Sequence, residues 1–390
     1  MSMWKECEGL QEELVKIRRE LHQIPEFGFD LPETQKYVTD KLDELGIPYK
    51  CSGTDSSIIA EIKGGQPGKT VALRADMDAL KITEANDVDY KSKHEGLMHA
   101  CGHDNHIAML LGAAKVLNAH KAEIKGNVRL LFQTAEELSK GAEIMIKDGA
   151  MDGVDAVFGQ HIGSIINKDI PAGKVIVTPG CCMASFDRFV IHVKGTGCHG
   201  STPEKGTDPI TMASHIVINL QEIIAREVSA VKAAVVTIGY FHGGVAYNAI
   251  PSEVEIEGTI RALEEPIRQY LAKRIEESTA ATFRGIAEVE MDWGAPPVIN
   301  NDEMAALVTE AAKEVVGEED VVSKVPAPNM AGEDFAYYLQ KVPGAFFFLS
   351  SSNPVKHTDV PHHNPHFNVD EDVLYKGSAM FVKIVEAYLK

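Results

Sequence analysis

Thiol, imidazole and carboxylate side chains gather in a few short segments of this sequence. Cys101 and His103 lie in CGHD, just before an expected helix, and Glu136-Glu137 directly follows the apolar run NVRLLFQ. His161 ends the run DAVFGQH, and His362-His363 lies in the proline-rich segment VPHHNPHF. Thiolate, imidazole and carboxylate together suit zinc or another borderline divalent cation, and a set of this size could hold two ions.

Two neighbouring cations can share a bridging water and lower its pKa, and a nearby carboxylate must then move the proton. Adjacent glutamates such as Glu136 and Glu137 can supply a ligand and a base for that chemistry. Other interpretations stay open on the residues alone. Cys101 could be a nucleophile activated by His103, the glutamate pair could be a solvated surface at a helix N-terminus, and His161 could be an ordinary core histidine.

The elements that must position these side chains alternate between strands and helices. A first helix ends before Pro25, and a second is expected over 33–45. Further expected elements of this part are strands at 56–62, 70–75, 127–133 and 155–161 and helices at 105–119 and 140–148. This alternation favours an α/β fold with a mixed, mostly parallel sheet and flanking helices. The candidate side chains follow strand ends, where open α/β sheets bind ligands.

The order of elements changes from about Phe186. The expected order is a strand in FDRFVIHVKG, a helix at 207–228, strands at 233–241 and 252–262, a helix in EPIRQYLAKRIEESTAATF and a strand at 287–293. This βαββαβ order predicts an inserted ferredoxin-like α+β module, after which helices and strands alternate again. We therefore expect a metal-binding catalytic domain made of 1–184 and 295–390, interrupted by a lid and dimerisation domain at 185–294.

Composition narrows the class of protein. The 390 residues include 57 Asp and Glu against 38 Lys and Arg, a formal net charge of −19. This acidic balance disfavours nucleic acid and anionic membranes as partners, because both need a basic footprint. No apolar run is long enough to span a membrane, and the charged N-terminal segment lacks the core of a signal peptide. Six cysteines, two of them adjacent, do not resemble a disulfide framework, so we expect a cytoplasmic protein.

Several motifs together carry a resemblance to a known family. They are RADMDAL (74–80), GLMHACGHDNHIAMLLGAA (96–114), FQTAEE (132–137), GCHGSTPEKGTDPI (197–210), NAIP (248–251), GTIR (258–261), GEDF (332–335) and HNPHF (363–367). In these segments the chain resembles the amidohydrolase branch of the aminoacylase/carboxypeptidase dinuclear metallopeptidases. That branch includes hippurate hydrolases and plant enzymes that hydrolyse auxin–amino-acid conjugates. The resemblance covers essentially the whole chain.

The resemblance implies a metal site with two divalent ions, which zinc, manganese, cobalt or nickel would suit. The implied ligands are Cys101 with a bridging thiolate, His103, Glu137, His161 and His363. His362 stands where the family has an apolar residue. Because two histidines are adjacent here, His362 is the alternative to His363 as the last ligand. Glu136 falls on the general base, and Asp78 falls on a residue that orients a ligand histidine.

The resemblance also implies how a substrate is bound. His199 falls on a lid histidine that polarises the scissile carbonyl, often in the partner subunit's site, so a homodimer through the lid is expected. Asn248 and Arg261 match residues that contact substrate, and Arg261 suits a carboxylate. The expected reaction cleaves the amide of an N-acyl amino acid, such as an N-acetyl or benzoyl derivative. A metal-bound hydroxide attacks the amide, with Glu136 as base.

Two alternatives belong to other functional classes. A dipeptidase or carboxypeptidase of the same architecture would act on an amide whose acyl side is itself an amino acid. A catalytically inert binding homologue would keep the scaffold and lose a ligand or the base, whereas this sequence keeps every expected one.

Overall fold

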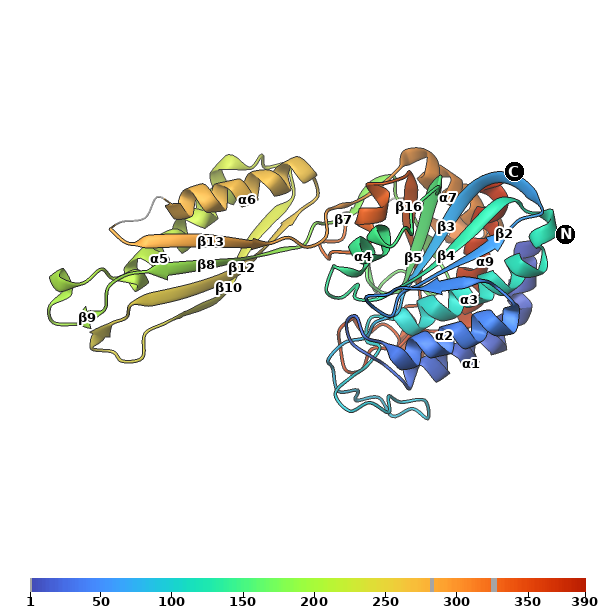
Figure 1. Ribbon diagram of the computed structural model, residues 1–390, viewed down its shortest axis with the longest axis horizontal. Helices are drawn as coiled ribbons and strands as arrows, with labels where there is room; N and C mark the ends of the chain where they lie inside the picture. Colours follow the sequence, from blue (N-terminus) through green and yellow to red (C-terminus); the bar gives the residue numbers. More distant parts are fainter. Residues whose placement is uncertain (1, 281–283, 324–327) are drawn as a thin grey trace. The chain divides into compact units, whose positions relative to one another are not determined.

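The computed structural model describes residues 2–280, 284–323 and 328–390, which form two compact units (Figure 1). The first unit comprises Met1–Cys182, Ile299–Asn329 and Asp334–Lys390, and the second comprises Met183–Val298 and Met330–Glu333. Each unit has its own hydrophobic core.

Eight strands form the main sheet of the first unit, in the order β1-β2-β4-β3-β5-β16-β6-β15. The four central strands, β4, β3, β5 and β16, run parallel, whereas β1, β2 and β6 join antiparallel neighbours. The strands are β1 Tyr49–Cys51, β2 Ile58–Lys63, β3 Gln66–Asp76, β4 Lys125–Gln133, β5 Ala156–Gly163, β6 Val175–Ile176, β15 Val321–Val322 and β16 Gly344–Ser350. The predicted mixed sheet with a parallel centre is confirmed.

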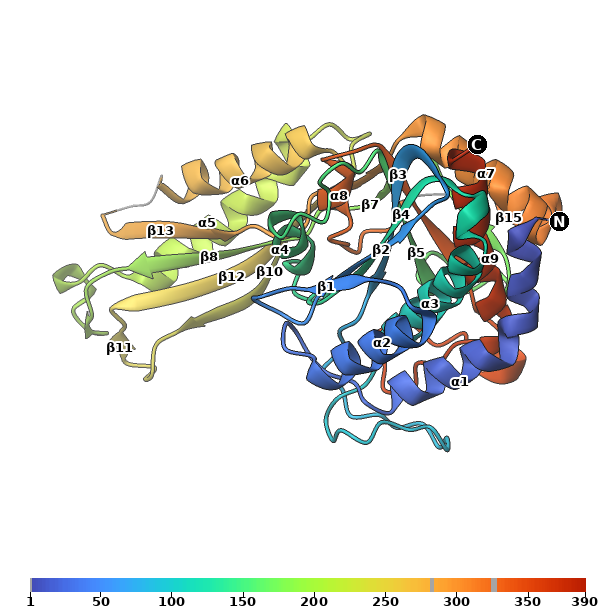
Figure 2. The same ribbon diagram turned by 45° about the vertical axis from the view of Figure 1, so that its right-hand side comes forward.

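Helices flank this sheet (Figure 2). They are α1 Gln11–His22, α2 Pro32–Leu45, α3 His103–Ala119, α4 Gly141–Lys147, α7 Asp302–Val316, α8 Ala336–Leu339 and α9 Leu374–Tyr388. Helix α3 contacts α1, α2 and α9 as well as strand β3, so it is buried on almost every side. Gly46 caps the C-terminal end of helix α2, and its φ of 63° is the left-handed conformation that glycine adopts at little cost.

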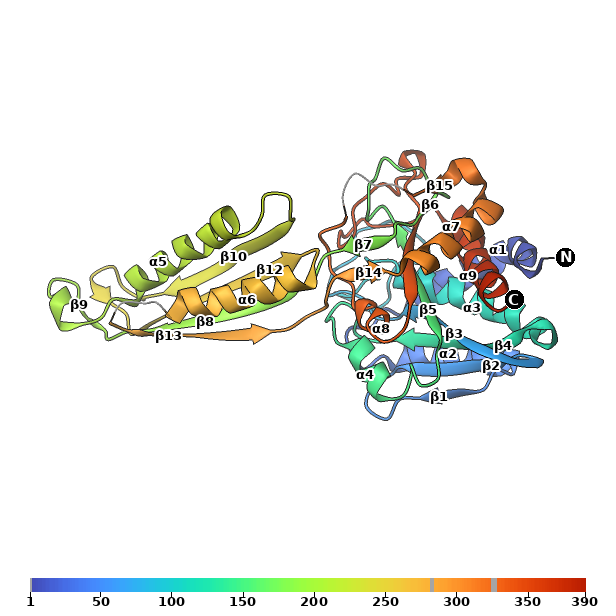
Figure 3. The same cartoon turned by 90° about the horizontal axis from the view of Figure 1, so that it is seen from above.

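The second unit has the predicted βαββαβ order. Its elements are β8 Asp187–Lys194, α5 Pro209–Glu222, β10 Ala234–Gly243, β12 Glu253–Ala262, α6 Glu265–Ala280 and β13 Ile286–Asp292. The four strands form an antiparallel sheet in the order β10-β12-β8-β13, and α5 and α6 pack against it (Figure 3). This ferredoxin-like topology is confirmed. The expected end of the second helix, 281–283, lies outside the described residues.

The strands that the sequence did not predict are short. Strands β1, β6, β7 (Gly180–Met183), β9 (Cys198–His199), β11 (Ala249–Ile250), β14 (Val298–Asn300) and β15 have two to four residues each. Such segments are too short to show a period-2 pattern. Among the described residues, no helix is both long and apolar enough to cross a lipid bilayer.

Candidate metal centre

Three neighbouring parallel strands end at one edge of the main sheet. Strand β3 ends at Asp76, β4 at Gln133 and β5 at Gly163, and helix α3 begins at His103. Because parallel strands present their carboxyl ends at the same edge, side chains that follow these strands meet there. The strand order β4-β3-β5 places the segments after Gln133 and before Gly163 on either side of β3.

The turn after β4 is shaped by Asp78. Ala135 has a φ of 52°, a left-handed conformation that turns the chain sharply before the glutamate pair. The buried carboxylate of Asp78 accepts backbone N–H bonds from Glu136 (3.0 Å) and Glu137 (3.2 Å). The backbone carbonyl of Asp78 accepts a bond from Nδ1 of His103 at 2.8 Å, which leaves Nε2 of His103 facing the glutamates. Asp78 therefore orients His103 through its main chain and the glutamates through its carboxylate.

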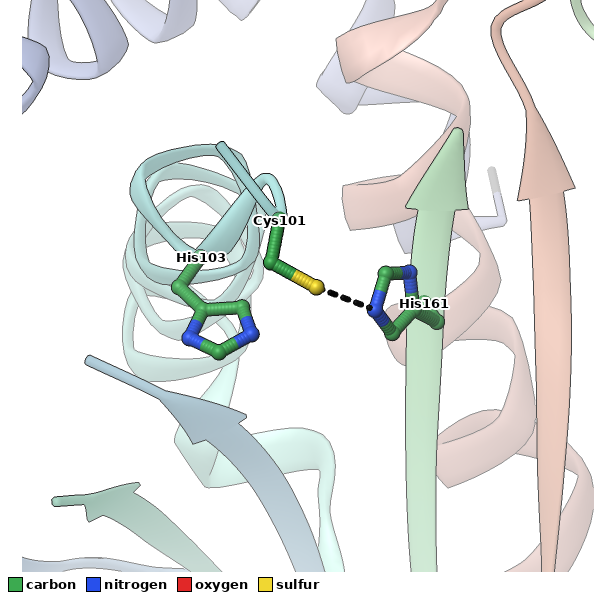
Figure 4. Close-up of side chains that lie close together, drawn as sticks. All are labelled: Cys101, His103 and His161. Carbon is green, nitrogen blue, oxygen red and sulfur yellow. Dashed lines mark hydrogen bonds between the residues drawn. The ribbon is translucent and has the colours of Figure 1, made fainter. Parts of the chain in front are cut away.

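The thiol of Cys101 lies at the centre of the cluster. Its Sγ is 3.4 Å from Nε2 of His161, and the ring of His103 lies beside both (Figure 4). Three sets of potential ligand atoms each lie within 4.8 Å of one another: Cys101 with His103 and His161, Cys101 with Glu137 and His363, and His103 with Glu136 and Glu137. Cys101 belongs to two of these sets, so the residues of the cluster would hold two divalent cations.

The two adjacent histidines 362 and 363 have different surroundings. Nε2 of His363 lies 3.4 Å from the carboxylate of Glu137, and the side chain is half exposed. His363 has a φ of 59°, a strained conformation for a non-glycine residue that often occurs at functional sites. His362 instead packs against His161 and Phe367, and Nδ1 bonds to the carbonyl of Cys101 at 3.2 Å. The geometry thus favours His363 over His362 as the last ligand.

The charges of the cluster favour a cation. Burial by itself lowers the pKa of His103, but Asp76, Asp78 and Glu137 outweigh it and raise the pKa to about 10. Burial and the two glutamates raise the pKa of the Cys101 thiol, and burial lowers the pKa of His161. The carboxylates therefore stabilise positive charge, and His161 keeps the neutral imidazole that a metal requires.

Two buried atoms of the cluster also fit a metal. Nε2 of His103 and Oε1 of Glu137 have no hydrogen-bond partner among the described residues. Buried polar atoms almost always have a hydrogen-bond partner. Two such atoms without a partner, 3.8 Å apart, therefore indicate that both face a ligand such as a metal ion. The residues present therefore fit the pair of divalent cations that the sequence led us to expect.

Sequence reasoning missed a second layer of this site. His106 accepts the backbone N–H of Ile162 on Nε2 (2.9 Å), so Nδ1 carries the proton and donates it to Asp76 (2.5 Å). The buried Arg74 in turn donates to Asp76 at 2.6 Å. These bonds tie β3, α3 and the end of β5 together next to His161. The available signals were the i, i+3 spacing of His103 and His106 on a helix and the i, i+2 spacing of Arg74 and Asp76 in a buried strand.

A buried ion network beneath the start of α3 was also missed. Arg18 of α1 donates to the carboxylate of Asp104 (2.9 Å) and to Glu371 (3.0 Å). His22, one turn further along α1, contacts Asp104 at 2.7 Å and Glu84 at 3.2 Å. Asp104 directly follows His103, so this network fixes the helix end that carries a candidate ligand.

The network predicts a pH dependence of stability. Burial and Arg18 lower the pKa of His22, but contacts with Asp104 and Glu84 outweigh them and raise it above its ordinary value. A pKa that is raised on folding stabilises the fold fully below about pH 6.5, the value in an unfolded chain, and this contribution is lost as the pH rises through the folded-state pKa.

We therefore expect the free energy of unfolding of the native chain to exceed that of His22→Gln most at low pH. Urea denaturation from about pH 5.5 to about pH 9 measures this difference, which should shrink as the pH rises. An advantage that stays constant with pH would contradict a charged His22.

The remaining candidate residues lie in the second unit. His199 of β9 is exposed and pairs with Ala249 of β11, and the carbonyl of Asn248 accepts a bond from Gly200 at 2.8 Å. Nδ1 of His199 accepts the backbone N–H of Ser201 (3.2 Å), so Nε2 carries the proton and can donate it to a ligand. Arg261 lies one residue before the C-terminal end of β12.

Comparison with known proteins shows to which family this chain belongs. The sequence model of peptidase family M20/M25/M40 matches residues 72–387. This chain belongs to that family. The family resemblance drawn from the motifs is thereby confirmed.

Relatives of this M20-family chain match it over nearly its full length. N-acetyl-L-cysteine deacetylase of Bacillus subtilis is 41% identical over 373 residues, covering 95% of this chain and 86% of the relative. Thermostable carboxypeptidase 2 of Saccharolobus solfataricus is 41% identical over 377 residues, covering 95% and 93%. A solved structure of a dinuclear metal binding peptidase from family M20 of Bacillus subtilis is 34% identical, with a TM-score of 0.82 and coverage of 98% and 99%.

Proposed function

We propose that this chain is a metal-dependent amidohydrolase that cleaves the amide of N-acyl amino acids, such as N-acetyl or benzoyl derivatives, to a carboxylate and a free amino acid. The observation that carries the proposal is the cluster around Cys101, with Glu136 buried at its side. The similarity to a deacetylase of N-acetyl-L-cysteine supports the substrate class. An inert binding homologue is disfavoured, because every expected ligand and the candidate base are present together.

The proposed metal ligands are Cys101, His103, Glu137, His161 and His363. Two divalent cations held there would polarise the amide carbonyl and lower the pKa of water, whichever of zinc, manganese, cobalt or nickel is native. Glu136 takes the proton from the attacking water and returns it to the leaving amine nitrogen. Nε2–H of His199 stabilises the developing oxyanion, and Asn248 and Arg261 bind the substrate. Asp78 holds the glutamates and His103 in place.

The second candidate is a dipeptidase or carboxypeptidase, and the similarity to a thermostable carboxypeptidase favours it. A dipeptide carries a free α-amino group, which needs an acidic partner, whereas an N-acyl group needs an apolar one. A panel that compares hippurate and N-acetyl amino acids with matched dipeptides, run with each of the four metals, separates the two activities. Faster turnover of the dipeptides would overturn the N-acyl assignment.

We also propose a homodimer in which His199 serves the partner subunit's site. Within the second unit, β9 and β11 lie before the start of β12, whereas Arg261 lies near its end. Glu253 and Arg261 are separated by roughly 25 Å at about 3.3 Å per residue. An N-acyl amino acid is far shorter than this distance. His199 and Arg261 of one subunit therefore cannot contact the same substrate molecule, which supports a role for His199 across a dimer.

Subunit mixing tests this arrangement. His199→Ala and Glu136→Ala are each expected to be inactive alone, since each removes one group that the reaction needs. A heterodimer retains one intact site if His199 acts in the partner, so mixing should restore up to about a quarter to a half of native activity. Native mass spectrometry of the mixture confirms that subunits exchange. Exchange without any recovery of activity would place His199 in its own subunit's site.

The proposed location is the cytoplasm. No disulfide joins any of the described cysteines, which is typical of a protein of a reducing compartment.

A further inference from the structure

Strands β3 and β5 separate from each other before they end. Their parallel pairing stops at Arg74 opposite Gly159. Strand β3 continues to Asp76, and β5 continues to Gly163. Among the described residues, no strand pairs with this last part of β5 on the side of β3, although β16 still pairs with it on the other side. Buried backbone groups need a hydrogen-bond partner, so another part of the chain must supply one.

The side chain of His106 bridges the two separated strand ends. Its Nε2 accepts the backbone N–H of Ile162 in β5 (2.9 Å), and its Nδ1 donates to Asp76 at the end of β3 (2.5 Å). Arg74 holds this acceptor in place, because it donates to both Asp76 (2.6 Å) and the buried Asp334 (2.8 Å). His106 thus replaces a rung of the β-ladder at the point where the strands separate.

The bond from Ile162 to His106 bears directly on His161. Nδ1 of His161 donates to the carbonyl of Ile162 at 2.8 Å, which leaves Nε2 without a proton and facing Sγ of Cys101, 3.4 Å away (Figure 4). The ring of His106 also stacks on His103, with centroids 5.4 Å apart, and meets His161 edge-on at 4.7 Å. The main chain at Ile162 therefore orients His161, and His106 holds that main chain.

We propose that His106 is a positioning residue of the metal centre, whose bond to the N–H of Ile162 holds His161 in the orientation that binds a cation. This inference rests on the proposed function and its metal ligands, and it adds a residue outside the ligand set that controls metal affinity. A ligand that is held in place beforehand loses less conformational freedom when it binds. Groups that orient metal ligands are typically worth about 10- to 100-fold in metal affinity.

Two substitutions separate the two bonds of His106. The amide of asparagine reaches about as far as Nδ1, so His106→Asn can still donate to Asp76 but cannot reach Ile162. The amide of glutamine reaches about as far as Nε2, so His106→Gln can still accept the N–H of Ile162 but loses the bond to Asp76. Both variants lack the ring, so a difference between them does not come from lost ring contacts.

The zinc affinity of the metal-free chain is the readout. Competition with a chromophoric chelator should show one of the two zinc dissociation constants raised about 10- to 100-fold in His106→Asn. In His106→Gln both constants should change by less than about 3-fold. His120→Asn and His120→Gln, at the C-terminal end of the same helix, are the matched controls and should bind zinc like the native chain. Equal losses in the two His106 variants, or a larger loss in His106→Gln, would overturn the proposal.

Urea denaturation of the metal-free variants tests for a merely structural role. Such a role would lower the free energy of unfolding in both His106 variants and weaken zinc binding equally. If His106→Asn does not fold, His106→Gln still decides the question. Native-like zinc affinity in that variant supports the bond to Ile162 as the important one, whereas a loss of about tenfold or more overturns it.

Zinc binding also separates this proposal from the proposed reaction, because it needs no substrate. A native chain that hydrolyses no N-acyl amino acid, but whose variants show the expected order of zinc affinities, would overturn only the reaction. Hydrolysis by the native chain together with equal zinc affinities of all variants would overturn only the positioning role of His106.

Discussion

Glu136→Gln should lower kcat by roughly 10²–10⁴-fold and leave both bound metals in place. The amide of glutamine cannot take a proton from water, whereas its size and its backbone N–H are those of glutamate. The backbone N–H of residue 136 bonds to Asp78, so the turn after β4 should keep its shape. Steady-state kinetics together with metal analysis of the same sample measure both effects.

Two matched variants make this result specific. Glu137→Gln removes a charged group that contacts His363 and faces His103, so it should lose metal as well as activity. Glu143→Gln lies in α4 outside the cluster and should be close to native. Near-normal turnover by Glu136→Gln with metal bound would show that another group is the base.

Arg18→Met should lower the free energy of unfolding by about 3–5 kcal/mol. Arg18 is fully buried and donates to Asp104, Glu371 and Asn368. Methionine fills similar space but leaves buried carboxylate charge uncompensated, which is far more costly than losing a surface pair. Urea denaturation measures the loss, and in a Trp293→Phe background the remaining Trp4 reports on the first unit.

Lys16→Met is the control for this prediction. Lys16 lies on the same helix, its side chain is 75% exposed, and its ion pair in the described part of the chain is with Glu20, one turn away at 3.9 Å. The same substitution there should change stability by less than about 0.5 kcal/mol. If Arg18→Met and Lys16→Met lowered the free energy of unfolding by the same small amount, the buried network around Arg18 would not be a source of stability.

The sequence predicted the central strands and the βαββαβ module because these elements are long enough for hydrophobic periodicity to show. The predicted strand over 127–133 corresponds to Lys125–Gln133, and the one over 155–161 corresponds to Ala156–Gly163. The candidate ligands could be grouped for the same reason. Once strands and helices alternate, residues such as Glu137 and His161 that follow or end parallel strands must share an edge.

The buried contacts that support the site could not be predicted, because they join distant parts of the chain. Arg18 and Asp104 are 86 positions apart, and nothing in α1 alone indicates that a charged residue turns inward. The choice between His362 and His363 depends on the left-handed backbone of His363, which the local sequence does not specify. The direction of β2, antiparallel to β4, depends on chain connections rather than on any pattern within the strand.

The space beside Gly163 links two positions that are far apart in the chain. A Cβ at Gly163 would lie 2.2 Å from Nε2 of His362, and the φ of 123° there already disfavours any other residue. A larger residue at 163 therefore requires a smaller one at 362, and a histidine at 362 requires glycine at 163. In evolutionary terms the dependence runs one way: a histidine at 362 depends on glycine at 163, whereas the backbone at 163 favours glycine whatever residue stands at 362.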